Sequence, residues 1–427
     1  MKRSIYTGMH YAIMPVVVGR LKWLARKHPG YAQNIAQRFG RVQPRHDSPL
    51  WIHAVSVGET IAAEPLVRLI QKAHPDWPIL ITNTTPTGAE QSERLFGDSV
   101  SHQYAPYDVP GTVERFLDRI NPRALVIMET ELWPNWVAEL SKRGVPSILA
   151  NARMSEKSAA RYARAGSMIS EMMSSLSFIA AQYQNDAQRF KELGASENAV
   201  SVLGNIKADI QITEDDRRVA EAAKSDLETP RAPVIIAAST HPGEDEIILD
   251  AFQRIQGTLP EALLYLVPRH AVRAAEVEAL ITDRNLQFVR RSDQSTNERI
   301  KVESDHAIVL GDQMGELRAL FGAADIVLMG GTLVDHGGHN PLEPAAWGLP
   351  ILAGPSQRNF DSLFNEMEAK GALGRTDNAS SAVANTLVSL WQDSSKRAAM
   401  SIAAADYLES QRGAATRVLE AIESLIA

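Results

Sequence analysis

Short apolar runs alternate with longer amphipathic stretches along most of this chain, and no other feature constrains its fold as strongly. Short apolar runs bounded by turn residues predict buried strands. The expected strands are Trp51–Val57, Ile79–Thr82, Ala124–Met128, Ser147–Ala150, Phe178–Ala181, Val200–Leu203, Val234–Ala238, Leu263–Val267, Ala307–Leu310, Ile326–Met329 and Ile351–Ala353.

Amphipathic stretches between these runs predict helices. They are Thr60–Ala73, Pro86–Phe96, Thr112–Ile120, Pro134–Arg143, Asp186–Leu193, Glu244–Gln256, Val272–Thr282, Gly315–Phe321, Leu342–Trp347 and Phe360–Glu368. Strands that alternate with helices form parallel sheets covered on both faces, so the pattern predicts an α/β fold.

The alternation is interrupted once, at 213–233, where the chain is acidic and ends in Thr229-Pro230-Arg231-Ala232-Pro233. A chain of 427 residues is also too long for one ordinary domain. We therefore expect two doubly wound, Rossmann-like domains, which would place a ligand cleft at the carboxyl ends of their strands. The predicted boundaries are a basic N-terminal segment at 1–45, domains at 46–212 and 234–394, a linker at 213–233 and a helical tail at 395–427.

The N-terminal segment carries the charge asymmetry of the chain. Nine Lys or Arg residues and no acid lie between Met1 and Arg45, whereas the rest of the chain has 35 basic and 51 acidic residues. Nucleic acid is therefore not expected as a partner. The uncharged run Ser4–Gly19 is shorter than the roughly 20 residues that span a bilayer, and no small-residue cleavage site follows it. We expect it to lie on the cytoplasmic face of a membrane, with a true span and an ordinary packed helix as alternatives.

The chain has no cysteine, which excludes disulfides and thiolate metal sites and fits a reducing cytoplasm.

Candidate catalytic residues follow strands of the first half. Glu59 comes after Trp51–Val57 in the first turn of a helix, where the helix dipole would favour its ionised form, so it could act as a general base. Glu129 and Glu131 follow Ala124–Met128, on one side of the chain if the extended run continues. Lys207 follows Val200–Leu203 and could meet an anionic group. The alternatives are that Glu59 only decorates a helix start, that Glu131 caps the next helix, and that Lys207 is solvated.

The second half provides groups suited to an activated nucleotide. His241 and Glu244 lie in a turn with hydroxyls and backbone amides suited to an anion, and Arg269 follows the strand Leu263–Val267, where a guanidinium can bind phosphate. The loop Gly330–Pro344 is the strongest candidate, because four glycines allow its backbone close to a ligand, Asn340 and Pro341 can start a helix, and Glu343 could accept bonds from ribose hydroxyls.

Two alternatives apply to this glycine-rich loop. Asp335, His336 and His339 could bind a divalent metal, although the loop itself offers no rigid ligand spacing, and the loop could also be a purely structural crossover. The chain lacks the P-loop and the GxGxxG dinucleotide fingerprint, which argues against an NTPase and a nicotinamide dehydrogenase.

Taken together, these stretches resemble the 3-deoxy-D-manno-oct-2-ulosonic acid (Kdo) transferases of lipid A assembly. The resemblance rests on Ser56-Val57-Gly58-Glu59, Glu129-Thr130-Glu131-Leu132-Trp133-Pro134, Pro268-Arg269-His270, Met314-Gly315-Glu316 and Gly338-His339-Asn340-Pro341-Leu342-Glu343-Pro344.

The resemblance implies a glycosyltransferase B fold, with no metal or other cofactor, and an inverting transfer of Kdo from CMP-Kdo to the lipid A precursor at the cytoplasmic side of the inner membrane. It implies Glu59 as the catalytic base, assisted by Glu129 and Lys207. The CMP contacts that it implies are Pro268, Arg269, Met314, Gly315, Glu316, Asn340, Pro341, Leu342 and Glu343. Two alternatives stay open: a transferase of the same fold with a UDP-sugar, and a catalytically silent scaffold that binds lipid A. The number of Kdo units added is not fixed by these motifs.

Overall fold

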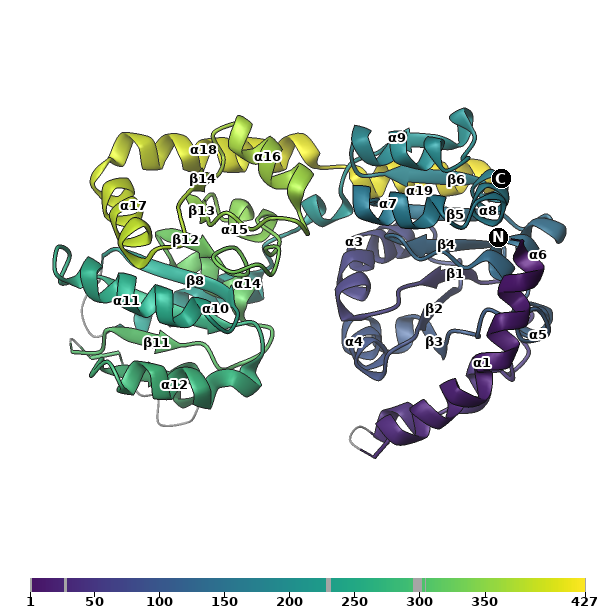
Figure 1. The fold of residues 1–427 in the computed structure, drawn as a ribbon, viewed down its shortest axis with the longest axis horizontal. Helices are drawn as coiled ribbons and strands as arrows, with labels where there is room; N and C mark the ends of the chain where they lie inside the picture. The colour runs from purple at the N-terminus through teal and green to yellow at the C-terminus, as the bar shows by residue number, and fades with distance from the viewer. Residues whose placement is uncertain (1, 27–28, 228–231, 295–301, 304, 427) are drawn as a thin grey trace. The chain divides into compact units, whose positions relative to one another are not determined.

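The chain folds into two compact units (Figure 1), the first made of Met1–Asp209 with Gln411–Ala427 and the second of Ile210–Ser410. The structure is a computed structural model that describes residues 2–26, 29–227, 232–294, 302–303 and 305–426. In this part of the chain, each unit is built on one seven-stranded sheet whose strand pairs are all parallel. The predicted α/β class is confirmed.

The sheet of the first unit has the order β3-β2-β1-β4-β5-β6-β7. Its strands are β1 (Leu50–His53), β2 (Ile79–Asn83), β3 (Ser101–Tyr104), β4 (Ala124–Met128), β5 (Ser147–Ala152), β6 (Phe178–Ala181) and β7 (Val200–Val202). β1 pairs with β2 on one side and β4 on the other, so the chain direction across the sheet reverses between β1 and β4. In open α/β sheets, ligands bind at such a switch point.

Alternate residues of these strands enter two separate cores. Trp51, Leu125 and Leu149 pack with α5 (Pro110–Ile120), α6 (Pro134–Lys142), α8 (Ser167–Ser175) and α9 (Gln184–Glu192). Leu50 and Val126 pack on the other face with α3 (Val57–Ala73) and α19 (Ala414–Ile426), and α4 (Pro86–Phe96) covers β2 and β3 beside α3. Period-two alternation of apolar residues thus buries both faces of the sheet. Two further elements are α2 (Ile35–Arg38) and α7 (Glu156–Ala163).

The sheet of the second unit repeats this plan in the order β10-β11-β9-β8-β12-β13-β14. Its strands are β8 (Val234–Thr240), β9 (Leu263–Pro268), β10 (Phe288–Arg290), β11 (Ile308–Leu310), β12 (Ile326–Met329), β13 (Ile351–Ala353) and β14 (Gly374–Arg375). The helices are α10 (Glu214–Ser225), α11 (Glu244–Gln256), α12 (Ala274–Thr282), α13 (Arg291–Gln294), α14 (Leu317–Leu320), α15 (Leu342–Ala346), α16 (Asp361–Ala369), α17 (Ser380–Gln392) and α18 (Ser394–Gln411). Here the switch point lies between β8 and β12.

Several boundaries differ from the expected ones. The run Trp51–Val57 is a strand only to His53, because the chain turns at Ser56 and α3 already begins at Val57. The expected linker 213–233 contains helix α10, which begins with a capping box between Thr213 and Asp216. The tail is helical as predicted apart from a break at Arg412 and Gly413, and its last helix, α19, packs on the first unit.

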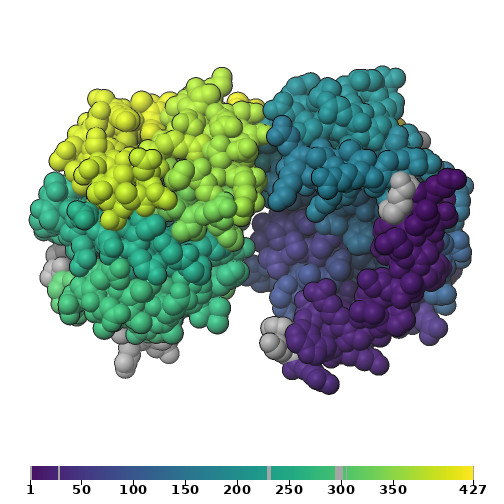
Figure 2. Space-filling view, in the orientation of Figure 1, coloured from purple at the N-terminus to yellow at the C-terminus, as the bar shows by residue number. Residues whose placement is uncertain are grey.

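The basic N-terminal segment forms helix α1 (Arg3–Leu24), which contains Pro15. It lies along the surface of the first unit (Figure 2) and contacts α6. Thr7 Oγ1 donates a hydrogen bond to Asn135 Oδ1 at 3.0 Å. In the described part of the chain, no helix combines the length and the apolar character that crossing a membrane requires.

Candidate active site

Glu59 lies at the switch point of the first sheet, in the first turn of α3. The Val55 N–H donates a hydrogen bond to Glu59 Oε2 at 2.6 Å. Burial raises the pKa of Glu59 to about 8 despite this bond, and the negative charges of Glu129 and Glu131 act in the same direction. The expectation that the helix dipole would keep Glu59 ionised is therefore wrong, since loss of solvation outweighs the hydrogen bond from the Val55 N–H.

Glu129 and Lys207 form an ion pair beside Glu59. Glu129 directly follows β4, and Lys207 lies in the 3₁₀ turn Ile206–Asp209 after β7. Lys207 Nζ donates to Glu129 Oε1 at 2.6 Å. Burial acts to raise the pKa of Glu129, but the charges of Lys207 and Arg153 outweigh it and hold that pKa below its ordinary value. The ion pair thus keeps Glu129 ionised. The neighbouring Glu59, with its pKa raised to about 8, is largely protonated at neutral pH.

The charge of Glu131 also acts on Glu59, although Glu131 is not aligned with Glu129 along an extended strand as was expected. The backbone turns left-handed at Glu129, with φ of 56°, so the extended run that would align Glu129 with Glu131 ends at Met128. Burial, helped by the charge of Glu129, raises the pKa of Glu131 to about 7. The alternative capping role is filled by Asp108, whose carboxylate accepts the N–H groups of Asn135 and Trp136 at the start of α6.

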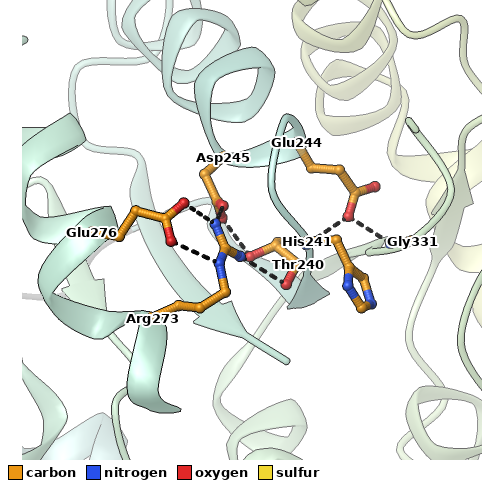
Figure 3. Close-up of polar contacts among 7 residues, drawn as sticks. All are labelled: Thr240, His241, Glu244, Asp245, Arg273, Glu276 and Gly331. Carbon is orange, nitrogen blue, oxygen red and sulfur yellow. Dashed lines mark hydrogen bonds and ion pairs between the residues drawn. The ribbon is translucent and has the colours of Figure 1, made fainter. Parts of the chain in front are cut away.

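In the second unit, Glu244 holds the equivalent place in the first turn of α11, after β8. Its carboxylate lies between the backbones of His241 and Gly331 (Figure 3), with Oε2 accepting N–H bonds from these residues at 2.9 and 2.6 Å. Oε1 accepts from the N–H groups of Thr332 and Leu333 at 3.0 and 2.9 Å. Four backbone donors therefore converge on one fully buried carboxylate.

This arrangement corrects the expected use of the glycine-rich loop. The amides of residues 331–333 bind a side chain of the protein and are not available to a ligand. The glycines serve packing: a Cβ on Gly330 would lie 2.3 Å from the carbonyl oxygen of Ser239, and Gly331 has a φ of +69°. Close backbone approach was expected to a ligand but occurs between the ends of β8 and β12.

A second network fixes the end of β8 (Figure 3). The Arg273 guanidinium donates to Asp245 Oδ2 at 2.6 Å and to Glu276 Oε1 at 2.8 Å. Thr240 Oγ1 donates to Asp245 Oδ1 at 2.5 Å. The bond between Arg273 and Asp245, which are 28 positions apart in the chain, links the start of α11 to the start of α12 and was not predicted.

The residues expected to contact CMP lie at or after the carboxyl ends of β9, β11 and β12 in the second sheet. Pro268 ends β9 and is buried, whereas Arg269, Met314 and Gly315 are exposed. Glu316 accepts a bond from Arg291 Nε at 2.9 Å, so part of its carboxylate is already engaged.

The remaining expected contacts start helix α15. Asn340 Oδ1 accepts the Leu342 N–H at 3.2 Å, and Glu343 lies in the first turn of α15, as predicted. Pro341 and Leu342 are buried, which limits their side chains to a packing role. These residues thus lie at the carboxyl-end edge of the second sheet, as predicted from the strand ends. Their contacts with CMP stay a prediction.

Three histidines gather beside this edge. His241 Nε2 lies 2.8 Å from His339 Nε2, and the rings of His241 and His336 stack with centroids 3.5 Å apart. Asp335, which the sequence suggested as their companion, instead pairs with Arg358 at 3.1 Å. Burial, helped by neighbouring positive groups, lowers the pKa of His241 to about 4 and that of His339 to about 3.

Comparison with known proteins identifies the class and then the family. The fold is similar to that of the Anabaena protein HepE in complex with UDP, with a TM-score of 0.60 at 14% identity, covering 88% of this chain and 100% of that one. The Neisseria meningitidis UDP-GlcNAc 2-epimerase gives a TM-score of 0.58 at 13% identity, covering 88% and 100%. Two doubly wound units with this likeness define a glycosyltransferase B fold.

The sequence comparisons are more specific. Residues 33–210 match the family model of the 3-deoxy-D-manno-octulosonic-acid transferases. The chain is 38% identical to such a transferase from Haemophilus influenzae, over 99% of this chain and 98% of the relative, and 35% identical to one from Bordetella pertussis, over 99% of both. The chain therefore belongs to the Kdo transferase family and is a glycosyltransferase.

Proposed function

We propose that this protein transfers Kdo from CMP-Kdo to the lipid A precursor with inversion at the anomeric carbon, and that Glu59 is the general base. The observation that carries this proposal is the state of Glu59: a half-buried carboxylate at a sheet switch point whose pKa is raised to about 8. A carboxylate with a pKa near the working pH accepts a proton far more readily than an ordinary one.

In the proposed step, a hydroxyl oxygen of the acceptor attacks the anomeric carbon of Kdo. The bond from that carbon to the phosphate oxygen breaks, and CMP leaves with the electron pair. The hydroxyl proton passes to Glu59, whose Oε1 accepts no hydrogen bond within the part of the chain that the structure describes. Attack from the face opposite CMP inverts the configuration.

The Glu129–Lys207 pair supports this step electrostatically. Its separation of 2.6 Å fixes the ammonium of Lys207 near Glu59. A fixed positive charge near the reacting centre stabilises the Kdo carboxylate and the negative charge that develops on the leaving group. Glu129 stays ionised because of Lys207 and Arg153, so it orients the lysine without competing for the proton.

The donor is expected at the carboxyl-end edge of the second sheet. Arg269 is exposed immediately after β9, and its guanidinium suits bidentate binding of a phosphate. Asn340 and Glu343 lie at the start of α15, which follows β12 at the same carboxyl-end edge of this sheet.

Helix α1 suits a membrane surface near a lipid acceptor. Ile5, Met9, Ile13, Val16 and Trp23 are exposed on it, and Arg3, Arg20 and Lys22 are basic. Exposed apolar side chains with basic neighbours favour binding to anionic lipid. In a vesicle sedimentation assay, we expect wild-type protein to bind vesicles that contain anionic lipid, and Val16→Glu to bind them much less. Equal binding by both proteins would exclude α1 as the docking element.

The transfer itself is tested with CMP-Kdo and tetra-acylated lipid A precursor. Mass spectrometry of the product should show the added mass of one or more Kdo units, and NMR should show an inverted anomeric centre. No product with CMP-Kdo, together with product from a UDP-sugar, would contradict the proposal in favour of another transferase of the same fold. No product from any donor would contradict the proposed acceptor.

A further inference from the structure

We propose that a pocket between α1, α2 and α5 of the first unit binds the headgroup phosphate of an anionic membrane phospholipid. Arg41, Arg115 and the hydroxyl group of Tyr11 line this pocket and would hold the phosphate. The proposal rests on the proposed docking of α1 at a membrane only for the source of the lipid. The pocket itself belongs to the first unit and can be tested without a membrane.

The pocket has the size of a small-molecule site. Its volume is about 490 Å³, which lies within the roughly 300–1,000 Å³ of common ligand pockets. One water molecule occupies about 30 Å³ in the liquid, so the space is far larger than a few waters need. Tyr11 of α1, Ala36 of α2 and Gly111 at the start of α5 line three of its sides. A phospholipid headgroup with its glycerol fits a space of this size.

The charges that line the pocket favour an anion. Arg41 and Arg115 line it without any acidic residue, and among the described residues neither arginine forms an ion pair with a carboxylate. Arg115 Nη1 donates to the carbonyl oxygen of Phe39 at 2.5 Å, which holds its guanidinium beside the segment that carries Arg41. This bond engages one nitrogen and leaves the positive charge without a counter-charge. Guanidinium groups bind phosphate oxygens through paired N–H donors.

Tyr11 and the start of α5 add further donors to the two arginines. The Gly111 N–H donates to Tyr11 Oη at 3.4 Å, a long hydrogen bond in which the tyrosine oxygen is the acceptor. The hydroxyl proton of Tyr11 can therefore be donated to a ligand. The first turn of α5 contains no acidic residue, so the partial positive charge of this helix N-terminus is not offset there.

The apolar part of the pocket favours a lipid over a free anion. Ile35, Ala36 and Phe39 line it beside the arginines, so the pocket offers apolar surface next to positive charge. The pocket also adjoins α1, on which Ile5 and Met9 are exposed. Basic side chains beside exposed apolar ones are typical of surfaces that bind anionic lipid. A phospholipid satisfies both parts of the pocket, whereas a free phosphate satisfies only the polar part.

Isothermal titration calorimetry with a soluble lipid tests the pocket in the full-length protein. The probe is dihexanoyl phosphatidylglycerol, kept below its critical micelle concentration. It should bind saturably and about tenfold more tightly than the zwitterionic dihexanoyl phosphatidylcholine or inorganic phosphate. The double substitution Arg41→Gln and Arg115→Gln should weaken binding by about 100-fold, because each guanidinium contributes charge-assisted hydrogen bonds.

Three further variants separate a pocket from a general positive surface. Ala36→Phe keeps both arginines but places a phenyl ring in the pocket, so it should weaken binding by about tenfold. Arg94→Gln is the matched control, since it removes an exposed arginine of the same unit that does not line the pocket. Val16→Glu, which tests the docking of α1, should bind the soluble lipid as the wild type does. The two proposals can thus fail separately.

Three outcomes would overturn the proposal. The first is the absence of saturable binding of phosphatidylglycerol to the wild-type protein. The second is equal affinity of the wild type and Ala36→Phe, which would assign the binding to surface charge. The third is equal affinity for phosphatidylglycerol and inorganic phosphate, which would identify the ligand as a free anion. Melting temperatures verify that each variant is folded.

Discussion

Glu59 and Glu244 occupy equivalent positions in the two units, yet their surroundings differ. Each lies in the first turn of the helix that follows the strand at the switch point of its sheet, β1 in the first unit and β8 in the second. Burial raises the pKa of both carboxyl groups. Glu244 receives four backbone N–H bonds that occupy both oxygens, whereas Glu59 receives one from the described residues, on Oε2.

The sheet topology puts a glutamate at the same position in both units. Its hydrogen-bond partners then determine whether the carboxylate supports the backbone or can accept a proton from a substrate. A carboxylate with both oxygens bound by backbone amides holds structure together and has no oxygen to offer. A carboxylate with one oxygen available, beside other charges, can accept a proton from a substrate. Substitution of each acid by its amide should therefore give opposite results in activity and stability assays.

The largest effect is expected for Glu59→Gln. An amide cannot accept the proton of the acceptor hydroxyl, so kcat should fall by about 1,000-fold in the transfer assay. The melting temperature should stay close to that of the wild type. Glu64→Gln, on the same helix, is the matched control and should retain full activity. A Glu59→Gln protein with near wild-type kcat would eliminate Glu59 as the base.

Lys207→Met should lower kcat by about 100-fold, because the variant loses a fixed positive charge at the reacting centre. Its partner Glu129 would also lose the charge that keeps its pKa low. Steady-state kinetics compares this variant with Lys191→Met, which removes a lysine from an ion pair with the exposed Glu197. Such surface pairs contribute little, so the control should resemble the wild type. Equal activity of the two variants would argue against a role for Lys207.

Glu244→Gln should mainly affect stability. The amide brings two N–H donors toward backbone N–H donors and leaves buried groups unsatisfied, at a cost of about 3 kcal/mol. Differential scanning calorimetry should show a melting transition lower by about 5–10 °C. Glu246→Gln, in the same turn of α11, should change it by less than about 2 °C. An unchanged transition in Glu244→Gln would show that the four N–H bonds are not important for the second unit.

Glu131→Gln should give the smallest effect, a shift in pH dependence. The charge of Glu131 contributes to the raised pKa of Glu59. Without that charge, Glu59 should lose its proton at a lower pH, and the midpoint of the kcat/KM profile should move below the wild-type midpoint. A midpoint that stays in place would mean that Glu131 does not interact with Glu59 during turnover.

Strands buried on both faces were the most predictable elements. β4, β6, β12 and β13 have the predicted boundaries, because an uninterrupted apolar run is sufficient to indicate them. The edge strands β3, β10 and β14 were missed: Ser101–Tyr104 is largely polar, and Phe288–Arg290 and Gly374–Arg375 are too short to show a pattern. Edge strands bury less surface, so their sequences carry a weaker signal.

The positions of the site residues could be predicted only where a single short segment of the sequence fixes them. Glu59, Glu129 and Arg269 could be placed at strand ends from local patterns. The bonds from Gly331, Thr332 and Leu333 to Glu244 could not, because these residues are 87 to 89 positions away in the chain. The same applies to His241 and His339, which are 98 positions apart and meet only because β8 pairs with β12.

The pH dependence of kcat/KM for the wild-type protein tests the role of Glu59 most directly. The pKa of Glu59 is raised, so the active, ionised form is gained as pH rises, and kcat/KM should increase about tenfold per unit at low pH and level off above a midpoint near the pKa of about 8. A profile that is flat from about pH 6 to about pH 9 would mean that the base has an ordinary carboxyl pKa, which would contradict the assignment of Glu59.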